Sequence, residues 1–202
     1  MTNLPPDFLA RTRALEDAYL QSDDPIAQSG FGGGPERWLA EREPILDAID
    51  GDGDLLDIGC ANGYLLRCLV DRGAERGLHL TPHGVDIGPR LIDLARAMHP
   101  VHAANFHIAN AWDWRPDRRF RYVYTLYDNV PETLLAPYLR RLLDRVVEPG
   151  GRLIAGAYGS RSRRTPPFAI AEFLEANGFA VAGETAGGDP PVAAFAWLDN
   201  NR

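Results

Sequence analysis

The spacing of hydrophobic and polar positions changes near residue 50 and divides the chain into two segments. Before this point, apolar residues recur at helical spacing from about Pro6 to Leu20 and from about Pro35 to Ile49. After it, short apolar runs alternate with amphipathic stretches of helical length. We therefore expect residues 1–50 to form a helical cap or lid and residues 51–202 to form one α/β domain.

The second segment predicts five strands that alternate with helices. The strands contain LLDI, HGVDI, NFHIA, RYVYTL and RLIAGAY, and helices are expected from about Gly63 to Arg76 and from Pro89 to Met98. Strands separated by helices of this length pair in parallel, with helices on both faces of the sheet. Because Pro137 interrupts the next helical stretch, we expect a turn followed by a helix that starts near Pro137 and ends near Val147.

The carboxyl-terminal part departs from this alternation. A helix is expected from Phe168 to Ala176, closed by Asn177-Gly178, and it is followed by the apolar stretches FAVAGET and VAAFAWLD with only AGGDPP between them. Two strands linked so closely pair as antiparallel neighbours. The predicted fold is a doubly wound, mostly parallel sheet that ends in an antiparallel hairpin.

A glycine-rich segment joins the two helices of the cap. It has glycines at positions 30, 32, 33 and 34, and Phe31 is the only large apolar residue among them. Such a hinge either connects the two helices or closes as a lid over a site.

Composition limits the function classes. The net charge of −7 argues against a protein whose main task is to hold a nucleic-acid backbone, and all 21 basic residues are arginine. The lack of lysine excludes Schiff-base chemistry, pyridoxal-phosphate attachment and a P-loop lysine. No apolar run reaches the roughly 18 residues of a membrane span, no signal-type segment opens the chain, and Cys60 and Cys68 are too far apart on the predicted helix for a disulfide. We expect a cytoplasmic protein with no membrane partner and no metal.

The stretch Leu55 to Leu66, LLDIGCANGYLL, carries the most specific chemistry. It joins an apolar strand, the acid Asp57 at the strand's end, and a turn with Gly59 and Gly63 that opens into a helix. Glycines in such a turn let a ligand approach the backbone. A phosphate site would favour positive charge here, whereas Asp57 suits a ligand with a cationic end.

From Asp54 to Asp199, the order and spacing of these motifs resemble the class I S-adenosylmethionine-dependent methyltransferases. The acid-x-Gly-x-Gly-x-Gly loop of that family is matched by Asp57, Gly59 and Gly63, with Ala61 in place of the middle glycine. The resemblance implies a seven-stranded sheet of order 3-2-1-4-5-7-6, S-adenosylmethionine as cofactor and S-adenosylhomocysteine as product. It also implies that Cys60 and Ala61 contact the cofactor.

The same resemblance implies how the nucleoside is held. Asp86, at the end of the second strand, would bind the ribose hydroxyls, and Ile87 would pack on the adenine. Asn110 and Ala111 would lie at the adenine edge, with Trp112 over the ring. A dehydrogenase-like alternative fits less well, because nicotinamide dinucleotides favour G-x-G-x-x-G whereas the two glycines of the loop are spaced G-x-x-x-G.

Tyr127, Asp128 and Asn129 follow the fourth strand and are expected nearest the transferable methyl group. Methyl transfer from a sulfonium needs mainly alignment, with a general base only where the acceptor loses a proton. All five histidines lie near the second and third strands and none follows the fourth, so a histidine base is not expected, and we interpret most of them as exposed polar residues of loops or helix ends. Asp128 is the predicted base and Tyr127 the residue that positions the acceptor; the alternative for Asp128 is a turn or helix-cap residue before Pro131.

The acceptor pocket is predicted from aromatic and arginine side chains. The candidates are Phe31, Trp38, Tyr127, Tyr158 and Arg161, the last with Arg163 and Arg164 as a clamp for an anionic acceptor. The alternatives are core packing for Trp38 and a solvated loop for the arginines.

The predicted function is methylation of a small molecule. RNA or protein methylation and a non-catalytic cofactor-binding module are the alternatives. The acceptor, the methylated atom and the oligomeric state leave no signature in the sequence.

Overall fold

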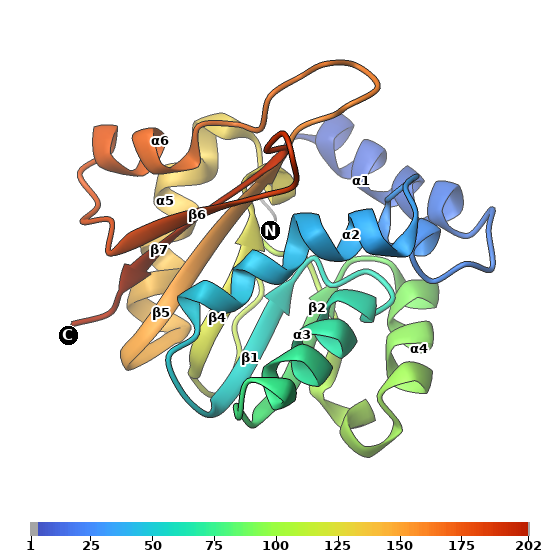
Figure 1. Ribbon diagram of the computed structural model, residues 1–202, viewed down its shortest axis with the longest axis horizontal. Coiled ribbons are helices and arrows are strands. Elements are labelled where there is room, and N and C mark those ends of the chain that lie inside the picture. Colours follow the sequence, from blue (N-terminus) through green and yellow to red (C-terminus); the bar gives the residue numbers. More distant parts are fainter. Residues whose placement is uncertain (1–3, 202) are drawn as a thin grey trace.

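The computed structural model describes residues 4–201, which form a seven-stranded sheet with helices on both faces (Figure 1). The strands are β1 Gly53–Ile58, β2 Leu80–Asp86, β3 Phe106–Ile108, β4 Phe120–Leu126, β5 Val147–Tyr158, β6 Gly183–Gly187 and β7 Ala193–Asp199. Their order is β3-β2-β1-β4-β5-β7-β6; neighbours from β3 to β5 are parallel, and β7 runs antiparallel to both β5 and β6. The predicted order and the terminal hairpin are confirmed.

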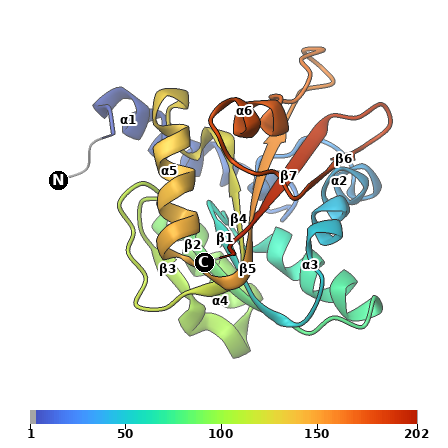
Figure 2. The same ribbon diagram turned by 90° about the vertical axis from the view of Figure 1, so that its left-hand side faces the viewer.

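Within residues 4–201, six α-helices surround the sheet. They are α1 Pro6–Tyr19, α2 Pro35–Arg42, α3 Tyr64–Glu75, α4 Pro89–Met98, α5 Glu132–Arg145 and α6 Ile170–Ala176. Four 3-10 helices lie between them, at Ala27–Ser29, Glu43–Ala48, Pro100–Asn105 and Tyr127–Asn129. Figure 2 shows α5 and α3 on opposite sides of the sheet. None of the described helices is long and apolar enough to span a bilayer.

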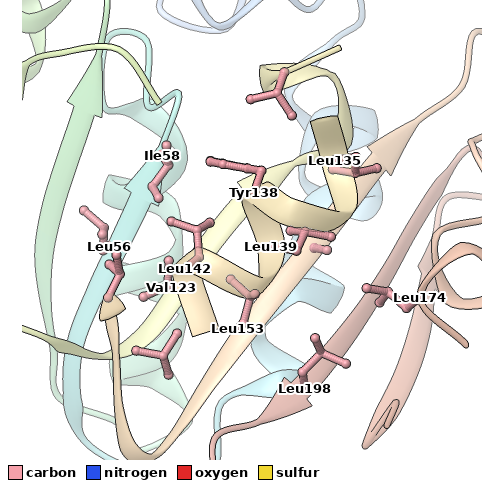
Figure 3. Close-up of a cluster of buried hydrophobic side chains, with 14 of the residues drawn as sticks. Leu56, Ile58, Val123, Leu135, Tyr138, Leu139, Leu142, Leu153, Leu174 and Leu198 are labelled. Carbon is pink, nitrogen blue, oxygen red and sulfur yellow. The ribbon is translucent and has the colours of Figure 1, made fainter. Parts of the chain in front are cut away.

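The alternation of side chains along the central strands separates two hydrophobic cores. Leu56 and Ile58 of β1 pack in the cluster beneath α5, whereas Leu55 packs in the cluster beneath α3 and α4. Figure 3 shows Leu139 and Leu142 of α5 facing the strands of the first cluster. Both faces of the central strands are buried, which explains why they are nearly continuous apolar runs in the sequence.

The helix after β4 differs from its prediction. It begins at Glu132, directly after Pro131, and passes through Pro137 instead of starting there. The reason is packing: its buried face starts at Leu135, before the proline, and continues through Tyr138. Burial of this face offsets the backbone hydrogen bond that a proline cannot donate.

Replacing Pro137 by alanine is therefore expected to raise the free energy of unfolding by about 1 kcal/mol. An alanine restores a helical N–H donor at an exposed position, and part of this gain is cancelled by the greater freedom of the unfolded chain. Urea denaturation measures the change. Pro131→Ala is the matched control, for which we expect no gain. Pro131 precedes the helix and has a φ of −55°, a value that the proline ring favours. An unchanged or lowered stability in Pro137→Ala would contradict this account.

Two further differences have local causes. The second cap helix ends at Arg42 and continues as the 3-10 helix Glu43–Ala48, in which Pro44 is near the start. The strand expected in FAVAGET begins only at Gly183, because the N–H of Phe179 closes α6 by donating to the carbonyl of Leu174.

Two of the five histidines, His83 and His99, are buried and are exceptions to the exposed positions expected for most of them. His83 pairs with Asp54 at 3.3 Å, and His99 Nε2 lies 3.0 Å from the carbonyl oxygen of Gly63. Burial lowers the pKa of both imidazoles.

Both cysteines are free thiols.

Candidate functional site

Two adjoining cavities lie at the carboxyl ends of β1, β2 and β4, where ligands bind in open α/β sheets. The first cavity, of about 180 Å³, reaches the ends of β2 and β3; the second cavity, of about 540 Å³, reaches α2 and the end of β5. Both are lined by Leu15, Tyr19, Ser29, Gly59, Ala61, Leu126 and Asp128. The shared wall makes them two halves of one site.

Asp86 organises the first cavity. Its Oδ2 accepts a hydrogen bond from the N–H of Ala61 at 2.9 Å, and its Oδ1 accepts one from the N–H of Gly88 at 2.8 Å. These bonds tie the turn after β1 to the turn after β2. Burial raises the pKa of Asp86, and the two backbone donors oppose the rise. The carboxylate is half-buried and lines the cavity, so it presents acceptor oxygens to a ligand.

The turn after β1 has two residues in the left-handed region directly at the cavities. Gly59 has a φ of 88°, and a Cβ at this position would lie 2.8 Å from Oδ1 of Asn129. Ala61 has a φ of 45°, a conformation that costs a residue with a Cβ about 1–2 kcal/mol. The alanine that replaces the family's middle glycine thus keeps a glycine-like backbone, and this conformation directs its N–H to Asp86.

Asn129 holds the same turn from the other side. Its Nδ2 donates to the carbonyl of Ile58 at 2.6 Å and to Oγ1 of Thr125 at 3.0 Å, so it links β1 to β4 beside the first cavity. Sequence reasoning located Asn129 near the site but gave it no role. Its position directly after the fourth strand was the available signal.

Asp57 is buried at the end of β1, with 3% of its surface exposed, and lines the second cavity. Desolvation, followed by the charge of Asp86, raises the pKa of Asp57 to about 8. The carboxyl group therefore holds a proton at neutral pH in the absence of a ligand. A cationic ligand beside it would favour ionisation.

The cap supplies Tyr19, which sequence reasoning missed. This residue of α1 lines both cavities. Burial and then the charges of Asp128 and Asp86 raise its pKa, whereas Arg42 opposes the rise. Its phenol thus lies among the acids of the first cavity and the arginine of the second. No local motif distinguishes this tyrosine from others on an amphipathic helix.

Asp128 also lines both cavities, as expected for a residue near the reacting atoms. Its side chain is open to the cavities, yet the protein around it removes part of its solvent and raises the pKa of the carboxyl group. A carboxylate with a raised pKa accepts a proton more readily at neutral pH.

The second cavity brings together four of the predicted acceptor residues. Phe31, Trp38, Tyr158 and Arg161 all line it. The glycine-rich segment forms part of the wall and is held in place: Asn62 Nδ2 donates to the carbonyl of Pro25 at 3.0 Å, and Trp38 Nε1 donates to Oγ of Ser29 at 3.1 Å. Cys60 and Ala61 lie at the boundary with the first cavity.

The first cavity contains most of the residues expected at the nucleoside. Ile87, Asn110 and Ala111 line it beside Asp86. Oδ1 of Asn110 accepts the N–H of Trp112 at 2.8 Å, which shapes the loop after β3.

Four predicted site residues do not line these cavities: Arg164, on the loop after β5, and three others. Tyr127 stacks on Phe168, with ring centroids 4.7 Å apart, beside a separate hollow. Trp112 packs against the hydrophobic cluster under α5. Gly63 begins α3, and a Cβ there would lie 3.0 Å from Cβ of Ala95 on α4, so this glycine serves helix packing. The expected direct ligand contacts of these three residues thus have no support in the geometry; each lies close in sequence to a residue that does line a cavity.

Comparison with known proteins identifies related domains and folds. Residues 55–151 match the family model described as a methyltransferase domain. A chain of the complex between the Haloferax volcanii Trm112 methyltransferase activator and a putative methyltransferase is 16% identical, with a TM-score of 0.68, covering 95% of this chain and 98% of that one. A second similar structure is the Burkholderia thailandensis 1,6-didemethyltoxoflavin-N1-methyltransferase with bound 1,6-didemethyltoxoflavin and S-adenosylhomocysteine. It is 15% identical, with a TM-score of 0.66, and the match covers 100% of this chain and 92% of that one. A SAM dependent methyltransferase from Aquifex aeolicus is 16% identical, with a TM-score of 0.61 and coverage of 91% and 97%.

Proposed function

We propose that this chain is a class I S-adenosylmethionine-dependent methyltransferase that methylates a small molecule, which enters the second cavity while the cofactor occupies the first. Residues 55–151 match a methyltransferase domain, and the sheet has the strand order that the resemblance to this family implies. The observation that carries this proposal is the charge of the first cavity. Its ionisable acids are Glu16, Asp86 and Asp128, and no arginine or histidine is among its described lining residues. Such a lining fits a cofactor that has no phosphate and carries a sulfonium and an ammonium group.

The chain's own residues have distinct tasks in this proposal. Asp86 accepts hydrogen bonds from the ribose hydroxyls, and Asn110 and Ala111 border the adenine. Asp57 and Gly59 adjoin the methionine end, where the turn after β1 passes from the first cavity to the second. When bound, the cofactor supplies a methyl group on an already activated carbon.

The shared wall between the cavities is where acceptor and cofactor would meet. Tyr19 and Asp128 both line it. Asp128, with its raised pKa, is the candidate to take a proton from an acceptor that must lose one. The cap helices exclude water from this junction, which helps to align the acceptor for in-line transfer.

The basic residues near β4 favour a small acceptor over RNA, because they bind other parts of the chain. Arg118 pairs with Asp54, Arg121 pairs with Asp50, and Arg119 donates to the carbonyls of Asp144 and Val147. These arginines are engaged within the chain and do not line either cavity. They therefore do not extend the site into the continuous electropositive surface that a phosphate backbone needs. RNA and protein acceptors are the alternative to be tested.

The test is transfer of a labelled methyl group from S-adenosylmethionine into a host extract separated by molecular mass. We expect label in the low-mass fraction, resistant to nuclease and protease, and identification of the methylated product by mass spectrometry. An Asp86→Ala enzyme serves as the cofactor-deficient control. Label confined to RNA or protein would overturn the small-molecule proposal.

A further inference from the structure

The second cavity contains a buried arginine whose bonding is incomplete. Arg42, the last residue of α2, has 9% of its side chain exposed and lines the cavity. Its Nη1 is buried and donates no hydrogen bond to any described residue. The nearest carboxylate oxygen, Oε2 of Glu41, lies 3.8 Å from it, an ion contact beyond hydrogen-bonding distance. A buried donor of this kind is costly unless a partner completes it.

Aromatic rings fix the guanidinium of Arg42 in place. Its central carbon lies 4.5 Å from the ring centroid of Phe31, 4.9 Å from that of Trp38 and 4.4 Å from that of Tyr158. Ring faces attract the cation but accept no strong hydrogen bond from its N–H groups. We call Phe31, Trp38 and Tyr158 the aromatic cage. The cage therefore holds the guanidinium in position but offers its N–H groups no hydrogen-bond acceptor.

Positive charge exceeds negative charge around the cage. Glu41 is the shared carboxylate of three guanidinium groups: Arg37 at 3.0 Å, Arg161 at 3.3 Å and Arg42 at 3.8 Å. The other acids on the wall are Asp57, which is protonated near neutral pH, and Asp128. The second cavity is thus cationic near α2, whereas the first cavity is acidic.

Arg161, the residue that sequence reasoning chose for an anion clamp, is already engaged. Its Nε donates to Glu41 at 3.3 Å, Nη1 to the carbonyl of Asp189 at 3.0 Å and Nη2 to the carbonyl of Pro190 at 3.2 Å. These bonds attach the loop after β5 to the turn between β6 and β7. Among the described residues that line the second cavity, the buried donor without a hydrogen-bond partner belongs to Arg42.

We propose that the methyl acceptor carries an oxyanion, a carboxylate or a phosphate, and that Arg42 in its aromatic cage is the residue that binds it. The inference rests on the proposed function and names the acceptor's class. A planar guanidinium pairs with either oxyanion through two parallel hydrogen bonds. Phe31 lies on the glycine-rich segment, so a shift of this segment would admit the anion to Nη1. An anionic acceptor and a cationic cofactor then match the opposite charges of the two cavities.

The test is binding of three simple probes to protein saturated with S-adenosylhomocysteine: benzoate, phenyl phosphate and the neutral benzamide. Thermal shift and calorimetry are the readouts, and neither requires turnover. We expect at least one of the anions to bind tenfold or more tightly than benzamide. Arg42→Met, which keeps an unbranched apolar stem and removes the guanidinium and its charge, should abolish this preference. Arg115→Met, at an exposed arginine outside both cavities, should keep it.

The outcomes separate this inference from the proposed function. Equal binding of benzamide and both anions, no detectable anion binding, or an unchanged anion preference in Arg42→Met would overturn the role of Arg42. If Arg42→Met does not fold, Arg42→Lys carries the test, because it retains the charge and loses the planar fork; retention of full anion affinity in that variant would also count against the inference. Labelled transfer to a neutral small molecule would leave the proposed function standing and refute only the oxyanion. Failure of wild-type protein to bind S-adenosylhomocysteine would instead refute the cofactor site.

Discussion

Asp86→Ala is expected to weaken binding of S-adenosylmethionine and S-adenosylhomocysteine by about 100-fold or more. The substitution removes a carboxylate that accepts two backbone hydrogen bonds, from Ala61 and Gly88, while it lines the first cavity. A hydrogen bond to a charged group contributes about 1.5–3 kcal/mol, and a factor of 100 corresponds to about 2.7 kcal/mol. The variant loses the ligand's contact with the carboxylate and also frees the turn that carries Ala61.

Calorimetric titration with S-adenosylhomocysteine measures the loss. Asp93→Ala is the matched control, since Asp93 is an exposed acid on α4 that pairs with Arg96 outside the cavities, and it should bind as tightly as wild type. Asp86→Asn retains one acceptor oxygen and should fall between the two. Wild-type affinity in a folded Asp86→Ala protein would show that the first cavity is not the cofactor site.

The parts of the fold that the sequence predicted are those in which local pattern and long-range packing agree. The central strands are buried on both faces and appear as apolar runs, and the acid and glycines after β1 follow one another within a few residues. The predicted start of α5 was wrong because local pattern and long-range packing disagree there. Pro137 opposes a helix locally, but Leu135 and Tyr138 bury the helical face on both sides of it.

The site shows the same division. Asp57, Asp86 and Asn110 are found from strand ends because the topology brings those ends together. Tyr19 and Arg42 belong to the cap, and their place over the sheet depends on how α1 and α2 fold back across it. That arrangement comes from contacts between residues far apart in the chain, such as Asn62 with Pro25, and no local spacing encodes it.

Replacing Asp57 by asparagine is expected to stabilise the ligand-free protein, and to do so more strongly as the pH rises. The pKa of Asp57 is about 8 in the folded protein, against about 3.9 for an unfolded aspartate. Between these values the folded state holds a proton that the unfolded state releases, so wild type loses stability as the pH rises through the window, and the loss is complete above about pH 8. Asparagine has the same shape and no proton to release.

Urea denaturation at several pH values measures this effect. We expect the difference in free energy of unfolding between Asp57→Asn and wild type to be smallest near pH 5 and to grow by roughly 3 kcal/mol towards pH 8, below the upper bound of 1.36 kcal/mol per pH unit. Other groups titrate alike in both proteins and cancel in the difference. An equal difference at both pH values would show that the carboxyl group of Asp57 titrates normally.

The raised pKa of Asp57 also couples ligand binding to proton release. A positive charge near a buried carboxyl group lowers its pKa, so binding of S-adenosylmethionine to wild type at pH 7 should release a proton into solution. Calorimetry in buffers of different ionisation enthalpy counts this proton. Asp57→Asn should release no proton and should bind the cofactor more weakly. We expect the affinity of wild type to rise between pH 6 and 8 and that of Asp57→Asn to stay constant over this range. If both proteins released the same number of protons, Asp57 would lie outside the reach of the cofactor's charge, and its burial would have to be explained without the ligand.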